Sequence, residues 1–223
     1  MSNLLRNLIY LIMGIGFSIC HAGSFEDFFA AIKRDDATVV SRLLQLGFDP
    51  NTPSPDGIDP LFLALREPSL KVADVLIGWP KTRVETRNSV DESPLMMAAL
   101  KGHLTQVRRL LARDADVNKP GWTPLHYAAT GGHVEVIREL LNAHAYIDAE
   151  SPNRTTPLMM AARYGSAAAV RALLESGADP TLRNDQGLTA VDFAFRASRQ
   201  DMAALIAAAA RDWAKPAAGG TKW

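Results

Sequence analysis

The chain contains the sequence Thr123-Pro124-Leu125-His126-Tyr127-Ala128-Ala129, and close copies of it recur at other positions. The copies are Asp59-Pro60-Leu61-Phe62-Leu63-Ala64, Ser93-Pro94-Leu95-Met96-Met97-Ala98-Ala99, Thr156-Pro157-Leu158-Met159-Met160-Ala161-Ala162 and Thr189-Ala190-Val191-Asp192-Phe193-Ala194. The second residues of the five stretches, Pro60, Pro94, Pro124, Pro157 and Ala190, follow one another at intervals of 34, 30, 33 and 33 residues. A near-constant interval of this size is the sequence signature of a repeat protein.

Two further landmarks recur in the same order. An apolar pair follows each copy and also precedes the first one: Leu43-Leu44, Val75-Leu76, Leu110-Leu111, Leu140-Leu141, Leu173-Leu174 and Leu205-Ile206. A closing turn comes next at Gly47-Phe48-Asp49-Pro50-Asn51, Ala115-Asp116-Val117-Asn118, Ala145-Tyr146-Ile147-Asp148 and Gly177-Ala178-Asp179-Pro180. This ordered set of landmarks resembles the ankyrin repeat, and the resemblance covers roughly Phe25 to Arg211.

The chemistry of each landmark predicts helices. A Ser or Thr before Pro caps a helix, and Pro fits the first turn, where its missing N–H donor costs nothing. Ala-Ala gives a small face that lets neighbouring helices approach closely. Gly102-His103 and Gly132-His133 end one helix and open the next, which carries apolar residues at helical spacing, as Val134, Ile137 and Leu140 do.

The sequence therefore predicts an all-α, ankyrin-repeat solenoid of about six helix-turn-helix units with short hairpin-like loops, within 23–211. The predicted units are about 25–55, 56–89, 90–119, 120–152, 153–185 and 186–211. The first and last units are predicted caps, because they depart from the Thr-Pro-Leu pattern. A flexible tail rich in Pro, Gly and Ala is expected over 212–223.

Three irregularities stand out. The connection from Ala112 to Trp122 is about three residues shorter than its neighbours, which predicts a clipped turn. Gly78-Trp79-Pro80-Lys81 occupies the place of a closing loop, which predicts a bulge. Asp114 and His144 stand where a helix-ending Gly is usual, so both are expected to adopt positive φ.

The first 22 residues read as a signal peptide. Arg6 is followed by an apolar run from Leu8 to Ile19, which is shorter than the roughly 20 residues of a membrane span, and Cys20-His21-Ala22 offers a cleavage site. An uncleaved anchor and a buried helix of the fold are the alternatives. The bulky Ile19 disfavours lipidation of Cys20. We therefore expect export, with the periplasm of a Gram-negative bacterium as the expected location.

Composition argues against nucleic acid. Lys plus Arg and Asp plus Glu number 24 each, whereas binding to phosphates needs a strongly basic surface. No phosphate-binding loop, nucleophile elbow or His-Glu-x-x-His motif is present. We therefore expect no catalytic activity, no cofactor and no small-molecule substrate, and a membrane contact only if the signal segment is uncleaved.

The histidines and methionines have structural interpretations. His126 occupies a position that, in the ankyrin family, hydrogen-bonds neighbouring turns; a structural role is also expected for His103, His133 and His144. Met96-Met97 and Met159-Met160 suggest a copper site, but helices about 8–10 Å apart cannot bring such ligands within about 2–2.5 Å of one ion. Core packing is therefore expected for the methionines.

The resemblance places a partner on the concave face and loop tips. Trp122 and Tyr164 are the predicted anchors, because aromatic residues are enriched at binding hot spots. Lys101 and Arg163 are predicted to bind acidic groups of the partner. The remaining candidates are Arg66, Glu92 and Arg196, and Trp79 is a weaker one.

Three functional hypotheses follow. The first is a non-catalytic protein-protein interaction module in the bacterial envelope, acting as a monomer. The second is an immunity or inhibitor protein that neutralises an exported toxin or enzyme. The third is a methionine-based metal or redox stress protein.

Overall fold

The structure, a computed structural model, describes residues 23–213. These residues form helices joined by turns and loops, and none of them is in a strand. The predicted signal peptide, 1–22, lies outside the described residues, as does 214–223. The last helix continues through Asp212 and Trp213, so these two residues are helical and not part of a flexible tail as predicted. Contacts between residues divide the chain into two compact units, Met1–Arg83 and Val84–Trp223.

The first unit holds a helix over 23–33 followed by α2 (Ala37–Gln45), α3 (Pro60–Arg66) and α4 (Leu70–Gly78). Asp36 and Asp59 cap α2 and α3 by accepting hydrogen bonds from backbone N–H groups. Phe28 is fully buried and lies against Phe48, with ring centroids 4.4 Å apart. An aromatic cluster thus forms the core of the predicted N-terminal cap.

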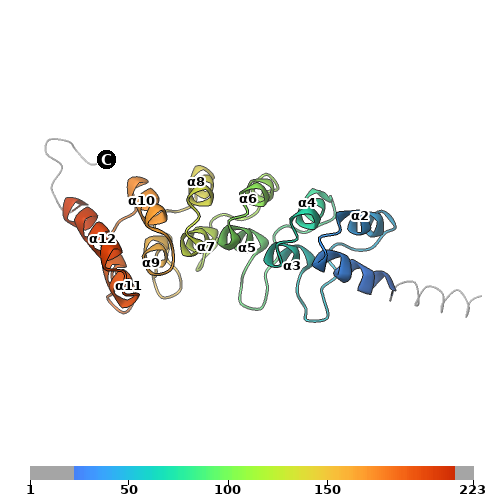
Figure 1. Cartoon of the computed structure of the whole chain (residues 1–223), viewed down its shortest axis with the longest axis horizontal. Helices are drawn as coiled ribbons and strands as arrows, with labels where there is room; N and C mark the ends of the chain where they lie inside the picture. The colour runs from blue at the N-terminus through green and yellow to red at the C-terminus, as the bar shows by residue number, and fades with distance from the viewer. Residues whose placement is uncertain (1–22, 214–223) are drawn as a thin grey trace, which may run out of the picture. The chain divides into compact units, whose positions relative to one another are not determined.

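The second unit holds four helix pairs. They are α5 (Pro94–Lys101) with α6 (Leu104–Leu111), α7 (Pro124–Gly131) with α8 (Val134–Asn142), α9 (Pro157–Arg163) with α10 (Ala167–Glu175), and α11 (Ala190–Arg196) with α12 (Gln200–Trp213). The first helices of the pairs contact one another in order, α5 to α7 to α9 to α11, and the second helices form a parallel row (Figure 1).

The residues predicted to begin and end the helices are confirmed. Ser93, Thr123, Thr156 and Thr189 are the N-cap residues of α5, α7, α9 and α11. Gly102 and Gly132 end α5 and α7 in the left-handed conformation, with φ of 74° and 73°. Each N-cap contributes about 1 kcal/mol to helix stability.

The small residues lie where close packing requires them. The Ala-Ala pairs of α5, α7 and α9 have no exposed surface, and neither do Leu95, Leu125 and Leu158. The face predicted to be apolar is therefore the core. Asp114 and His144 have φ of 59° and 63°, which confirms their predicted left-handed conformation.

The irregular segment after α4 differs from the other closing turns. Trp79 caps α4 in an extended conformation, with φ of −79° and ψ of 125°, so no left-handed residue turns the chain there. The Trp79 carbonyl accepts a hydrogen bond from Thr82 N–H at 3.0 Å. This short turn takes the place of the predicted bulge, and Trp79 is half-buried.

Candidate interaction surface

Four of the predicted contact residues lie at the ends of the first helices of the second unit. Lys101, Arg163 and Arg196 are the last residues of α5, α9 and α11, and Tyr164 is the C-cap of α9. Because these helices contact one another in order, the four residues lie along one row. Arg66 belongs to the first unit, where it forms an ion pair with Glu67 at 3.0 Å.

The cations of this row are available to a partner. Within residues 23–213, neither Lys101 nor Arg163 forms an ion pair. The Arg163 guanidinium carbon lies 5.0 Å from the centroid of the Tyr164 ring, in a cation–π contact. Tyr164 is 55% exposed, so this pair presents both a ring and a charge to solvent.

The second predicted anchor, Trp122, lines a hollow on the same row of helices. We call it the Trp122 hollow, and its volume is about 220 Å³. Its lining residues are Leu100, Trp122, His126, Tyr127, Thr130 and Met160. Except for His126, which is fully buried, these residues are half-buried, so the hollow is open to solvent.

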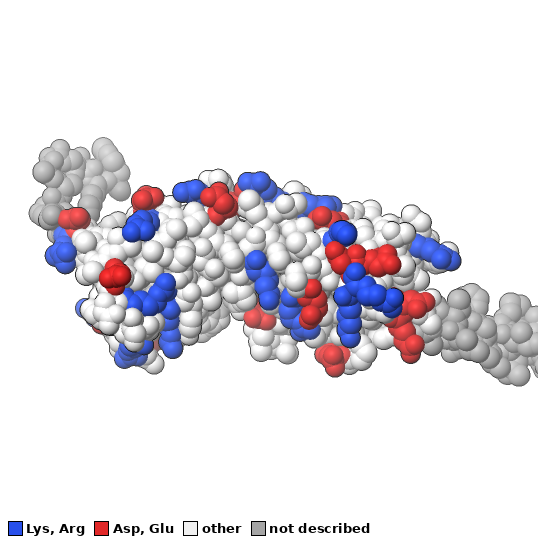
Figure 2. Space-filling view, viewed as in Figure 1, with Lys and Arg blue, Asp and Glu red and all other residues white. Residues whose placement is uncertain are grey.

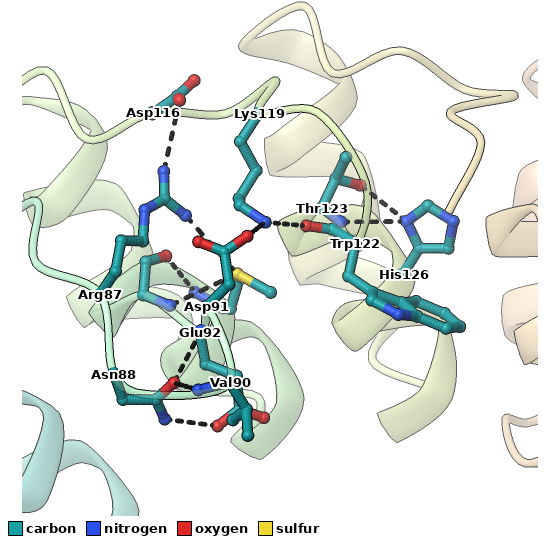
Figure 3. Close-up of polar contacts among 12 residues, drawn as sticks. Arg87, Asn88, Val90, Asp91, Glu92, Asp116, Lys119, Trp122, Thr123 and His126 are labelled. Carbon is teal, nitrogen blue, oxygen red and sulfur yellow. Dashed lines mark hydrogen bonds and ion pairs between the residues drawn. The ribbon is translucent and has the colours of Figure 1, made fainter. Parts of the chain in front are cut away.

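The clipped loop before α7 needs an unusual contact to hold Trp122. In the other hairpins, a backbone N–H donates to the carbonyl just before the N-cap: Ser54 to Ile58, Asn88 to Glu92, Ser151 to Thr155 and Asn184 to Leu188. In the clipped loop the equivalent carbonyl is that of Trp122, and the Lys119 ammonium donates to it at 3.2 Å (Figure 3). A side chain therefore replaces the missing backbone donor.

Lys119 is itself held by the preceding hairpin. Its side chain is only 6% exposed, and its ammonium pairs with the Asp91 carboxylate (Figure 3). This hydrogen-bonded ion pair lowers the pKa of Asp91. Arg87 in the same hairpin pairs with Glu85 at 2.7 Å and with Asp116 at 3.4 Å. These contacts fix the clipped loop, and hence Trp122, against the neighbouring repeat.

Glu92, a predicted partner contact, is engaged within the protein. Its Oε1 accepts a hydrogen bond from the Tyr127 hydroxyl at 2.8 Å, and its Oε2 accepts one from Asn88 Nδ2 at 2.8 Å. Burial, reinforced by the hydrogen bond to Glu92, raises the pKa of Tyr127. Glu92 therefore orients Tyr127 in the wall of the hollow.

His126 has the structural role that was predicted for it. Its Nδ1 accepts a hydrogen bond from the Thr123 N–H at 3.1 Å, which leaves Nε2 to donate to the Thr155 carbonyl at 2.8 Å. Burial lowers the pKa of His126 to about 4. The neutral imidazole thus caps α7 and also links it to the next hairpin. The Trp122 ring packs edge-on against it, with centroids 5.1 Å apart.

Within residues 23–213, every methionine except Met160 is buried in the core. Met96 and Met159 occupy the position of His126 in their repeats, and their sulfurs accept hydrogen bonds at 3.4 Å from the N–H groups of Ser93 and Thr156. Met97 is also buried, as expected. Met160 differs from that expectation, because it is half-buried and lines the Trp122 hollow.

Sequence reasoning missed Lys119, Tyr127 and Met160 as parts of this site. The role of Lys119 was indicated by the interval of only 30 residues between Pro94 and Pro124. The loop in this interval is too short to form the backbone hydrogen bond that closes the other hairpins. Tyr127 and Met160 occupy equivalent positions, three residues after Pro124 and Pro157. That shared register places both on the same side of adjacent helices.

Residues 23–213 include no group of three or more His, Cys, Asp or Glu side chains that could hold a metal ion. None of the helices in this part of the chain has the length and apolar character needed to cross a membrane. Figure 2 shows acidic and basic side chains interspersed on the face in view.

Comparison with known proteins establishes the family. Residues 28–120, 72–151, 95–184 and 144–215 match the family described as "Ankyrin repeats (3 copies)". The chain therefore belongs to the ankyrin-repeat family. The ankyrin repeat domain of human ASB11 is a similar solved structure, with a TM-score of 0.68 and 28% identity, and the match covers 79% of this chain and 80% of that one.

Curated relatives share the repeats within much longer proteins. The "Ankyrin repeat and KH domain-containing protein mask" of Drosophila melanogaster is 34% identical over 102 residues, covering 44% of this chain and 2% of the relative. The "Ankyrin repeat and SAM domain-containing protein 6" of Mus musculus is 38% identical over 132 residues, covering 59% of this chain and 12% of the relative. The chain thus spans a small part of these relatives.

Proposed function

We propose that this protein is a non-catalytic binding module that holds a partner protein on the row formed by α5, α7, α9 and α11. Ankyrin repeats are protein-protein interaction modules. One observation carries the choice of surface: the open, apolar Trp122 hollow is lined by residues of α5, α7 and α9, and α5 and α9 end in two cations that have no ion pair within residues 23–213. Aromatic anchors bordered by charges are typical of binding hot spots.

A capture experiment with two variants tests this function. The bait is the chain from Gly23 onward, incubated with an extract of the source organism, and the test variant is Trp122→Ala/Tyr164→Ala. We expect one stoichiometric partner that the double variant loses. Tyr146→Ala is the matched control, because Tyr146 is 68% exposed but lies in a closing turn, off the row. A partner that the double variant retains would move the site elsewhere.

The narrower inhibitor hypothesis uses the same surface and adds one requirement. The captured partner would be an exported enzyme or toxin, and its activity would fall in proportion to the amount of protein added. A partner whose activity is unchanged at saturation would rule out inhibition and leave the binding function in place.

We also propose that the protein acts after export, in a bacterial envelope. The support is the sequence of 1–22, where a positive start, an apolar run and small residues before Gly23 follow the order of a signal peptide. The test is cell fractionation with mass spectrometry of the N-terminus. A periplasmic chain beginning at Gly23 is the expected result, and an intact N-terminus in the cytoplasm would contradict export.

A further inference from the structure

We propose that the Trp122 hollow receives one aromatic side chain from an extended segment of the partner protein, with an acidic side chain beside it that meets Lys101 or Arg163. This inference rests on the proposed binding function and specifies the chemistry of the partner. The anchoring residue of the partner would be Phe, Tyr or Trp.

The size of the hollow favours a single side chain. Its volume of about 220 Å³ lies below the roughly 300–1,000 Å³ of small-molecule and cofactor sites. Because it is open to solvent, the hollow contains water in the free protein. An anchoring ring would displace that water, as the side chains of binding hot spots do.

Three polar side chains of the lining, those of His126, Tyr127 and Thr130, already have hydrogen-bond partners inside the protein. The Tyr127 hydroxyl donates to Glu92, and both ring nitrogens of His126 are hydrogen-bonded. The Thr130 hydroxyl donates to the His126 carbonyl at 2.8 Å. An apolar ring entering the hollow therefore breaks none of these hydrogen bonds, whereas a polar group would give up water without finding these groups free.

The remaining walls suit an aromatic ring in particular. Met160 offers a thioether, which makes favourable contacts with ring edges. Trp122 and Tyr127 offer aromatic surface, and Lys119 and Glu92 hold these two residues in place through the Trp122 carbonyl and the Tyr127 hydroxyl. Walls that are already ordered lose little conformational entropy when a partner binds.

The charges at the edge of the hollow favour an acidic neighbour. Lys101 and Arg163 are the last residues of α5 and α9, the helices that supply Leu100 and Met160 to the hollow. Arg163 lies three residues after Met160, which places both on the same side of α9. Both cations lack an ion pair within residues 23–213. Glu92 is the acidic residue next to Tyr127, and its two oxygens accept hydrogen bonds from within the protein.

The first test uses small probes and needs no knowledge of the partner. The protein is titrated with 3-phenylpropionate, 2-phenylethylamine and propionate, while NMR follows the Met160 methyl and the Trp122 indole N–H. We expect 3-phenylpropionate to bind with a Kd on the order of 1 mM, from the usual affinity per atom of small ligands. The amine and the ring-free acid should bind at least about tenfold more weakly. Equal shifts with the amine would overturn the charge assignment, and no shift with any probe would overturn the site.

Variants distinguish the contribution of the aromatic ring of the probe from the contribution of its carboxylate. Met160→Ala should weaken 3-phenylpropionate binding roughly fivefold, whereas Met160→Leu should retain it, because Leu keeps the wall. Lys101→Gln/Arg163→Gln should lose the preference for acid over amine while still taking the ring. Lys101 and Arg163 are exposed and Met160 is half-buried. Circular dichroism checks that each variant is folded. If none of these variants changes the binding of the probe, the probe does not bind in the Trp122 hollow.

A peptide pair tests whether the occupant is a protein segment. A short blocked peptide with Phe between two Asp residues should bind roughly tenfold more tightly than 3-phenylpropionate, and the same peptide with Ala in place of Phe should not bind measurably. A peptide no tighter than the free acid would indicate a small aromatic acid as the occupant and would overturn the proposal. If the probes fail but the captured partner still depends on Trp122, the binding function stands without this anchor.

Discussion

His126 makes the stability of the second unit depend on pH. Its pKa is about 4 in the folded protein and about 6.5 when unfolded. As pH falls below 6.5 the unfolded chain takes up a proton that the folded protein excludes, so folded stability declines until about pH 4. Above pH 6.5 this contribution is fully present, and it amounts to on the order of 3 kcal/mol.

A comparison with His126→Met measures this contribution. Met occupies the same position in the repeats of Met96 and Met159, so the variant keeps an acceptor for the Thr123 N–H. It loses the donor to the Thr155 carbonyl, which should cost about 1 kcal/mol at pH 7. In urea denaturation, the stability gap between the two proteins should narrow or reverse between pH 6.5 and pH 4. A constant gap over that range would mean that His126 does not titrate as stated.

Lys119 is predicted to be a positioning residue for Trp122. Lys119→Met removes the only hydrogen-bond donor that the described residues supply to the Trp122 carbonyl, which should cost about 1–2 kcal/mol of unfolding free energy. The Trp122 indole resonance should shift as the loop relaxes. Lys101→Met is the control, because the Lys101 side chain is exposed and pairs with no acidic group in the part of the chain that the structure describes. Its effect should stay within about 0.5 kcal/mol. Equal effects of the two substitutions would contradict the positioning role.

Residue-level reasoning predicted the contacts whose chemistry is local. Ser93 and Thr156 cap helices because of what immediately follows them, and Asp114 turns the chain because a helix ends there. It could not predict that Met97 is buried and Met160 only half-buried, since both stand in the same Pro-Leu-Met-Met-Ala-Ala sequence. Their different burial depends on the neighbouring repeat, which a local pattern does not contain.

At the scale of the helices, the junction of α9 and α10 depends on Gly165. A Cβ added there would lie 2.3 Å from the Ala129 carbonyl oxygen and 2.9 Å from the Ala161 Cα, and both are backbone atoms that cannot move aside easily. Gly165→Ala should therefore force α7 and α9 apart and cost about 1–3 kcal/mol in urea denaturation. Gly23→Ala is the control, because no atom of the described residues, 23–213, lies within 4 Å of its added Cβ. If the Gly165→Ala protein were as stable as this control, the close approach of Gly165 to the Ala129 carbonyl would be contradicted.

The order and type of the helices were predictable because each pair repeats the same signals at a nearly constant interval. The element that carries the candidate site was less predictable. Its loop is shortened, and a buried ammonium group replaces a backbone hydrogen bond there. The shortened loop indicates that a backbone hydrogen bond is missing and must be replaced. It does not indicate which side chain replaces it, since the ion pair that holds Lys119 joins residues 28 positions apart, Asp91 and Lys119.

At the scale of the whole molecule, the division at Arg83 and Val84 predicts two regions that unfold separately. In a repeat protein each unit is stabilised chiefly by its immediate neighbours, so a local loss of stability need not spread along the chain. Phe28→Ala removes a fully buried ring from the aromatic core of the first unit and should cost about 3–5 kcal/mol there. Hydrogen exchange should then accelerate in 23–83, while amides of α7 and α9 keep their protection. If protection fell equally in both regions, the two units would form one cooperative structure and the predicted independence would be wrong.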